Sequence, residues 1–224
     1  FSGRMKNARE QLSDLKERGQ RLKGVFAGSF LGTLAGNAVS GGIHLLASGI
    51  KAAGAAALNY DRELQTLQAT WNTLTGSASK GKQMVDMTLQ MAAAANNSVD
   101  MVEDLNTKMY AVTNSAGETK KLTTAMLTLQ DAFGQSDDAV KGFATQWSQM
   151  QGNGKVSAQD MMSFINVFAP MRKELLDTMR VQTGNHKLTM QQMNDMMSAG
   201  KISSETMDQV LYKMQKNYAN ASVE

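Results

Sequence analysis

Several residue types are missing or rare in this chain of 224 residues. It has no cysteine, which excludes a disulfide framework and a thiolate metal site and fits a reducing compartment. It has one proline and only 6% aromatic residues, whereas strands favour aromatic and β-branched residues. The chain is instead rich in Ala, Leu, Gln, Lys and Met, which are good helix formers. We therefore expect an all-α fold without a substantial sheet.

Residues that carry catalysis are also scarce. The only histidines, His44 and His186, lie far apart in the sequence, and we expect His186 to be exposed just before a helix start. The sequence has no His-Glu-x-x-His motif, no Gly-x-Ser-x-Gly elbow and no phosphate-binding Gly-rich loop. Glu103-Asp104 and Asp137-Asp138 are adjacent carboxylates, which point to different sides of a helix and are typical of a solvated surface. The sequence thus predicts no enzyme, no cofactor and no metal site.

The net charge of +3 is concentrated at one end of the chain. Residues 1–24 hold seven Lys/Arg and three Asp/Glu, a local balance of +4, so the other 200 residues sum to −1. This distribution predicts a basic amphipathic helix with a solvated face, and argues against a protein-wide surface for nucleic acid. The first residue is Phe1, from which we expect a fragment or a processed product, and no standard targeting segment is evident.

A long uncharged segment follows that basic end. Val25–Ile50 contains no Lys, Arg, Asp or Glu, and as one helix it would extend about 39 Å, enough to cross a hydrocarbon core. Glycines recur along one face of that helix at every fourth position, namely at Gly24, Gly28, Gly32 and Gly36. This spacing lets another helix approach closely. We expect this glycine zipper to pack against copies of itself or against other protein, and a transmembrane helix is the alternative.

The rest of the chain reads as shorter helices. Residues 59–97 predict a helix, a turn at 75–77 and a second helix, and further helices are expected at 98–115, 118–133 and 136–151. The predicted organisation is an N-terminal part over residues 1–58, made of the basic and apolar helices, and a helical domain over residues 59–220. The fold class is thus all-α, with long N-terminal helices followed by a bundle of short capped helices.

One pattern occurs three times in the last third of the chain: Lys, an aliphatic residue, Ser or Thr, and Met four positions later. It begins at Lys155, Lys187 and Lys201, and places Ser157, Thr189 and Ser203 as helix N-caps, whose hydroxyls accept from free backbone N–H groups of the first turn. The aliphatic residue and the methionine are the two ends of a hydrophobic staple. The pattern predicts helices at 157–180, 189–198 and 203–219. Helix-start chemistry alone can produce such a repeat.

Methionines are unusually dense from residue 161 onward. We expect them mainly to fill the core, because Met is flexible and adapts to irregular gaps. The alternative is a Met-rich groove for a partner protein.

An ordered set of motifs extends over most of the chain. The motifs run from Tyr60, through the segment at 71–77, to the segments at 144–160 and 200–204. In this order they resemble the tail tape measure proteins of long-tailed bacteriophages, and the resemblance covers roughly residues 60–212. Its most family-like positions are Trp71, Leu74, Thr75, Gly76, Ser77, Gln149, Met150, Gly154, Lys155, Gly200 and Lys201. The chain departs from the family at residues 92–97, where an apolar-Pro-Phe stretch is common, and at Trp147, where a smaller residue is expected.

The resemblance implies a structural protein of the virion that lies inside the tail tube, sets tail length and assists DNA delivery across the host envelope. Its implied partners are other copies of itself, the tail tube, tail-tip and tail-assembly chaperone proteins and, during infection, the host membrane, with no sequence-specific nucleic acid. Its implied location is the tail tube interior, and the host cytoplasm during assembly. The alternative, motivated by residues 24–58, is a membrane-active secreted protein of the pore-forming or bacteriocin type.

Overall fold

The computed structural model describes residues 55–95 and 97–219, and of residues 55–62 only the course of the helix. Within these ranges every named element of secondary structure is an α-helix, which confirms the all-α prediction. The predicted glycine zipper at Gly24, Gly28, Gly32 and Gly36, with the basic helix before it, lies outside the described residues. The chain divides into two compact units between Asn97 and Ser98, and each is described by itself.

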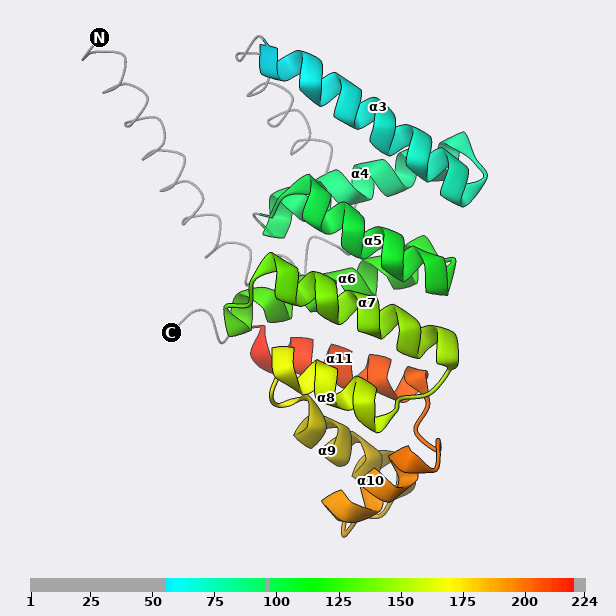
Figure 1. Cartoon of the computed structure of the whole chain (residues 1–224), viewed down its shortest axis with the longest axis vertical. Coiled ribbons are helices and arrows are strands. Elements are labelled where there is room, and N and C mark those ends of the chain that lie inside the picture. The colour runs from blue at the N-terminus through cyan, green and yellow to red at the C-terminus, as the bar shows by residue number, and fades with distance from the viewer. Residues whose placement is uncertain (1–54, 96, 220–224) are drawn as a thin grey trace, which may run out of the picture. The chain divides into compact units, whose positions relative to one another are not determined.

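The first unit contains a helical hairpin of α3 (Ala55–Thr75) and α4 (Ala78–Ala95), joined at Gly76-Ser77, as the sequence predicts (Figure 1). The Thr75 hydroxyl fixes the turn by donating to the carbonyl oxygens of Trp71, at 2.7 Å, and Ser77, at 2.9 Å. The two helices approach each other closely because α4 has a glycine, Gly81, where it faces α3. A Cβ on Gly81 would lie 2.8 Å from the backbone nitrogen of Asn72, which is too close for any side chain.

The second unit is a bundle of seven described helices, ordered along the chain as Figure 1 shows. They are α5 (Val99–Thr113), α6 (Ala116–Phe133), α7 (Asp137–Asn153), α8 (Ala158–Val167), α9 (Met171–Thr183), α10 (Met190–Ser198) and α11 (Ser204–Tyr218). The main packing pairs are α5 with α6 and α7, α11 with α6 and α9, and α7 with α8. Six of the seven begin at a Ser or Thr whose side chain accepts a first-turn N–H: Ser98, Ser115, Ser136, Ser157, Thr189 and Ser203.

The prediction of one helix over 157–180 is wrong, because the chain breaks between α8 and α9 at Phe168–Pro170. Pro170 has no backbone N–H and disfavours helical geometry in the residue before it, so the helix ends there and α9 starts anew. Phe168 leaves helical geometry, and its ring lies 4.8 Å from that of Phe143 and 5.8 Å from that of Phe133. The break thus turns an aromatic side chain into the core of the bundle.

The methionines of the second unit belong mainly to the core. Those from residue 161 onward with at most 4% of their surface exposed are Met161, Met171, Met179, Met193, Met197, Met207 and Met214. The three exceptions are Met196, which is partly exposed, and Met162 and Met190, with 50% and 36% exposed. This distribution favours core filling over a methionine-lined groove.

Candidate functional site

Two of the three repeated helix starts pair with each other in space. Gly154–Ser157 precedes α8, and Gly200–Ser203 precedes α11; Lys155 and Ser203 form an isolated antiparallel β-bridge. The Val156 N–H donates to the Ile202 carbonyl at 3.1 Å, and the Ser204 N–H donates to the Gly154 carbonyl at 3.1 Å. The aliphatic residues of both segments are 1% exposed. The pairing therefore ties the start of α11 to the start of α8.

Each of these starts is also stabilised locally. The Ser157 hydroxyl accepts from the Asp160 N–H at 3.1 Å, and the Asp160 carboxylate accepts from the Ser157 N–H at 2.8 Å, which completes a capping box. Ser203 accepts from the Thr206 N–H at 3.2 Å without the return bond of a capping box. The staple residues Met161 and Met207 are fully buried.

Glycine is required at two positions of the paired segments. Gly154 ends α7 with φ of 70°, in the left-handed region that other residues adopt at a cost. Gly200 also has a positive φ, of 66°, and it lies against the side chain of Lys155, whose Cδ would be 3.2 Å from a Cβ at that position. The stem of Lys155 therefore covers Gly200, whereas Lys201 is exposed.

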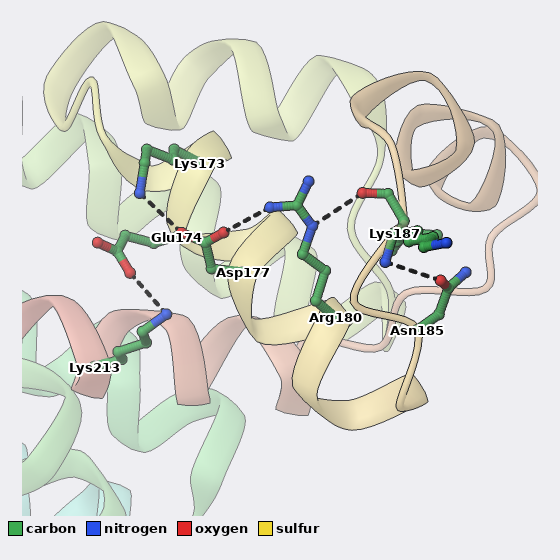
Figure 2. Close-up of polar contacts among 8 residues, drawn as sticks. Lys173, Glu174, Asp177, Arg180, Asn185, Lys187 and Lys213 are labelled. Atoms are coloured by element: carbon green, nitrogen blue, oxygen red, sulfur yellow. Dashed lines mark hydrogen bonds and ion pairs between the residues drawn. The ribbon is translucent and has the colours of Figure 1, made fainter.

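The third start, before α10, is held differently and takes no part in the β-bridge. Thr189 and Gln192 form a second capping box. The Leu188 carbonyl accepts a hydrogen bond from Arg180 Nε of α9 at 3.0 Å (Figure 2). In the same loop the Lys187 N–H donates to Asn185 Oδ1 at 3.1 Å. The start of α10 is thus anchored to α9.

Charged side chains along α9 form a network that reaches α11 (Figure 2). Asp177 accepts from Lys173 Nζ at 2.8 Å and from Arg180 Nη1 at 3.2 Å; the Lys173 hydrogen bond is the main cause that lowers the Asp177 pKa. Glu174 follows Lys173 in the sequence, and its carboxylate pairs with Lys213 Nζ of α11 at 3.0 Å. The Glu174 side chain is 8% exposed and that of Lys213 is 38% exposed, so the carboxylate depends on this partner more than the ammonium does.

Aromatic rings fill the space between α7, α8 and the break after α8. Phe143 lies within 5.2 Å, ring centre to ring centre, of Trp147, Phe164 and Phe168. Trp147 is fully buried there, although the family motif predicts a smaller residue at its position. The cluster uses tilted, edge-on and stacked pairs, the arrangements that aromatic quadrupoles favour.

A group of acidic side chains lies where α11 meets α6 and α7. Asp208 of α11 accepts from Gln151 Nε2 of α7 at 2.5 Å, and the Tyr212 hydroxyl donates to Glu118 Oε2 of α6 at 3.5 Å. Burial raises the pKa of Asp208 to about 7, against the opposing effect of the Trp147 and Gln151 side chains. Burial also raises the pKa of Tyr212, and the negative charges of Asp208 and Glu118 add to that rise.

The carboxylates of α5 are less solvated than their sequence suggests. Glu103 is partly buried, and its pKa is raised by that burial and by the charges of Asp100 and Asp104. Asp104 pairs with Lys108 at 2.5 Å. Asp137 and Asp138 are exposed, as predicted, and Asp137 accepts from Gln130 Nε2 at 2.7 Å.

The paired loops do not form a cation site. Gln149, Gln151, Asn153, Gly154 and Asp160 have the spacing of an EF-hand calcium loop, but amides replace its first carboxylates. The helix α7 continues through Asn153, and Asp160 is engaged by Ser157. Among the residues that the structure describes, no three His, Asp or Glu side chains are placed to hold a metal ion. The contacts of these segments are those of helix packing and capping.

Comparison with known proteins decides the family. The model of the tape measure protein family matches residues 55–223, which is most of the chain. The chain belongs to the tape measure protein family. This match confirms the resemblance inferred from the ordered motifs, and it makes the protein a structural component of the phage tail. No curated protein and no solved structure matches the chain.

The tape-measure motifs fall in both units. Trp71, Leu74, Thr75, Gly76 and Ser77 belong to the hairpin of the first unit, where Trp71 is fully buried and Leu74 is 42% exposed. The others lie in or beside the paired segments of the second unit: Gln149, Met150, Gly154, Lys155, Gly200 and Lys201. No sequence motif marks the Glu174–Lys213 pair or Asp208, because the contacts that define them join helices distant in sequence. The signal for the helix break, Pro170, was present in the sequence.

No helix in the described part of the tape measure chain is long and apolar enough to cross a membrane. The segment that motivated the transmembrane prediction, Val25–Ile50, lies outside that part.

Proposed function

We propose that this tape measure chain acts inside the tail tube, where it takes part in setting tail length and assists DNA delivery across the host envelope. The family match over residues 55–223 is the observation that carries the proposal. The all-helical architecture supports it, because a helix advances a fixed distance of about 1.5 Å per residue and can serve as a ruler.

Extended helical segments and folded helical bundles contribute differently to the length of such a ruler. The longest described helix, α3, has 21 residues and extends about 31 Å, and α4 packs back against it, so the hairpin adds the length of one helix and not of two. The second unit folds back on itself, since α5 and α6 are joined by a short turn at Asn114 and pack side by side. The length of a folded bundle depends on its helix lengths and not on its residue number. We therefore place the measuring function in extended helical segments, with the second unit as a folded module of fixed size.

We further propose that its partners are other copies of this chain and the tail tube, tail-tip and tail-assembly chaperone proteins, with the host membrane during infection. Val181 and Met162, with 74% and 50% of their surface exposed, are apolar side chains that a protein partner would cover. We place the protein in the tail tube interior of the virion, and in the host cytoplasm during assembly.

The test is a series of internal deletions in the intact phage protein, with tail length measured by electron microscopy. Deletions in extended helical segments are expected to shorten tails by about 1.5 Å per residue removed. A deletion of equal size within residues 98–219 should disrupt the bundle and reduce the yield of tails without a proportional change in length. Unchanged tail length across the first series would refute the ruler role.

A further inference from the structure

The helix α11 is the described element that joins most of the second unit together. It packs against α6, α7 and α9, and the β-bridge ties its first turn to the start of α8. Its polar contacts to those helices are specific: Asp208 with Gln151 of α7, Tyr212 with Glu118 of α6, and Lys213 with Glu174 of α9. Whatever changes one of these contacts changes how α11 docks on the bundle.

Of these contacts, the one made by Asp208 places a carboxylate where burial and neighbouring negative charges disfavour its ionised form. Its carboxylate is partly buried at the α7–α11 interface, where the Gln151 amide donates to it at 2.5 Å and the Trp147 indole lies beside it. Two negative charges act on it: that of Glu118 from α6, whose Oε1 is also paired with Lys121 at 2.7 Å, and that of Glu205 from α11 itself. On the side of α9, the neutral Gln182 faces the same turns of α11, where its side chain binds Gln209 and Thr206. Of the two cations on α11, Lys213 is paired with Glu174, and Lys216 is exposed in the last turn of the helix.

We propose that α11 docks on the bundle in a proton-dependent manner, with neutral Asp208 favouring the docked helix and ionised Asp208, beside Glu118 and Glu205, weakening it. This inference goes beyond the function proposed above and does not depend on it.

The sign and size follow from linkage. The pKa of Asp208 rises from 3.8 to about 7 in the docked helix, and an undocked helix returns it to its ordinary value. The docked state then binds more protons between these two values, so its stability falls as pH rises through that window and levels off above about pH 7. Undocking is therefore expected to become roughly tenfold more favourable between about pH 6 and about pH 8.

Amide hydrogen exchange of the full chain tests this, with rates corrected for the intrinsic effect of pH. Exchange from α11 should increase roughly tenfold between about pH 6 and about pH 8, whereas the increase in α5 should be much smaller. The variant Asp208→Asn keeps an acceptor for Gln151 and cannot ionise, so α11 should remain protected at both values. Asp195→Asn, an exposed carboxylate on α10 that accepts from Gln191, is the matched control and should behave as the unaltered chain does.

Equal exchange from α11 at both pH values in the unaltered chain would overturn the proposal. So would a pH dependence that persists in Asp208→Asn. Should circular dichroism show that this variant does not fold, a carbon NMR titration of the Asp208 carboxyl in the unaltered chain decides. A midpoint near 7 supports the proposal, and a midpoint near the ordinary value of 3.8 overturns it.

Discussion

Removal of the positive charge of Lys213 is expected to destabilise the second unit substantially. In Lys213→Met the apolar stem remains, but Glu174 loses the ammonium that lies 3.0 Å from its carboxylate. The Glu174 side chain is only 8% exposed, so water cannot replace that partner. Breaking a fully buried pair costs about 3–5 kcal/mol, and we expect about 2 kcal/mol here because the Lys213 side is partly solvated.

The two halves of this pair should not be equivalent. Glu174→Gln removes the buried charge itself and leaves Lys213, 38% exposed, which water can solvate. We therefore expect Glu174→Gln to cost clearly less than Lys213→Met. Lys173→Met is the matched control: it breaks an ion pair at 2.8 Å to Asp177, but the Lys173 side chain is 74% exposed, so the stability should hardly change.

Urea unfolding followed by circular dichroism measures these effects. With a denaturant slope of about 2 kcal/mol per molar, Lys213→Met should lower the midpoint by about 1 M. The double variant Lys213→Met/Glu174→Leu should recover much of that loss, because an apolar pair replaces a lone buried charge. A midpoint for Lys213→Met equal to that of the control, or a greater loss in Glu174→Gln, would contradict this reasoning.

Four further substitutions test the packing and the caps, each by the free energy of unfolding. Gly81→Ala should destabilise the first unit by about 1–3 kcal/mol, because the new Cβ meets the backbone of Asn72, whereas Gly142→Ala in α7, with open space around it, should stabilise by up to about 1 kcal/mol. Ser157→Ala should cost about 1 kcal/mol through loss of the α8 cap, and no change would argue against its capping box. Phe143→Ala should cost about 3–5 kcal/mol, since three aromatic rings pack on this side chain, and a loss below about 1 kcal/mol would refute its central place.

Features with short-range causes could be predicted from the sequence. The turn at Gly76-Ser77 and the boundaries of α5, α6 and α7 were predicted to within a few residues, because caps and turn residues act on their neighbours. The family could be inferred because its motifs occur in order along the chain. The division of 157–180 at Pro170 was also a local effect, and the prediction of one helix gave too little weight to proline.

The contacts between helices could not be predicted in the same way. A hydroxyl at Ser203 and a glycine at Gly154 indicate helix ends, but nothing near them in the sequence indicates that the two segments form a β-bridge. Asp208 reads as an ordinary surface carboxylate until α7 and α6 are packed against it.

The sequence by itself thus determined the helical class, most helix ends and the tape measure family, because hydrogen bonds to neighbouring residues and ordered motifs are properties of short segments. Only the tertiary structure decided which helix starts pair, which carboxylate is buried beside other carboxylates and which lysine neutralises Glu174. The physical reason is that desolvation and charge–charge interactions depend on distances across helix interfaces, which residues far apart in the chain define together.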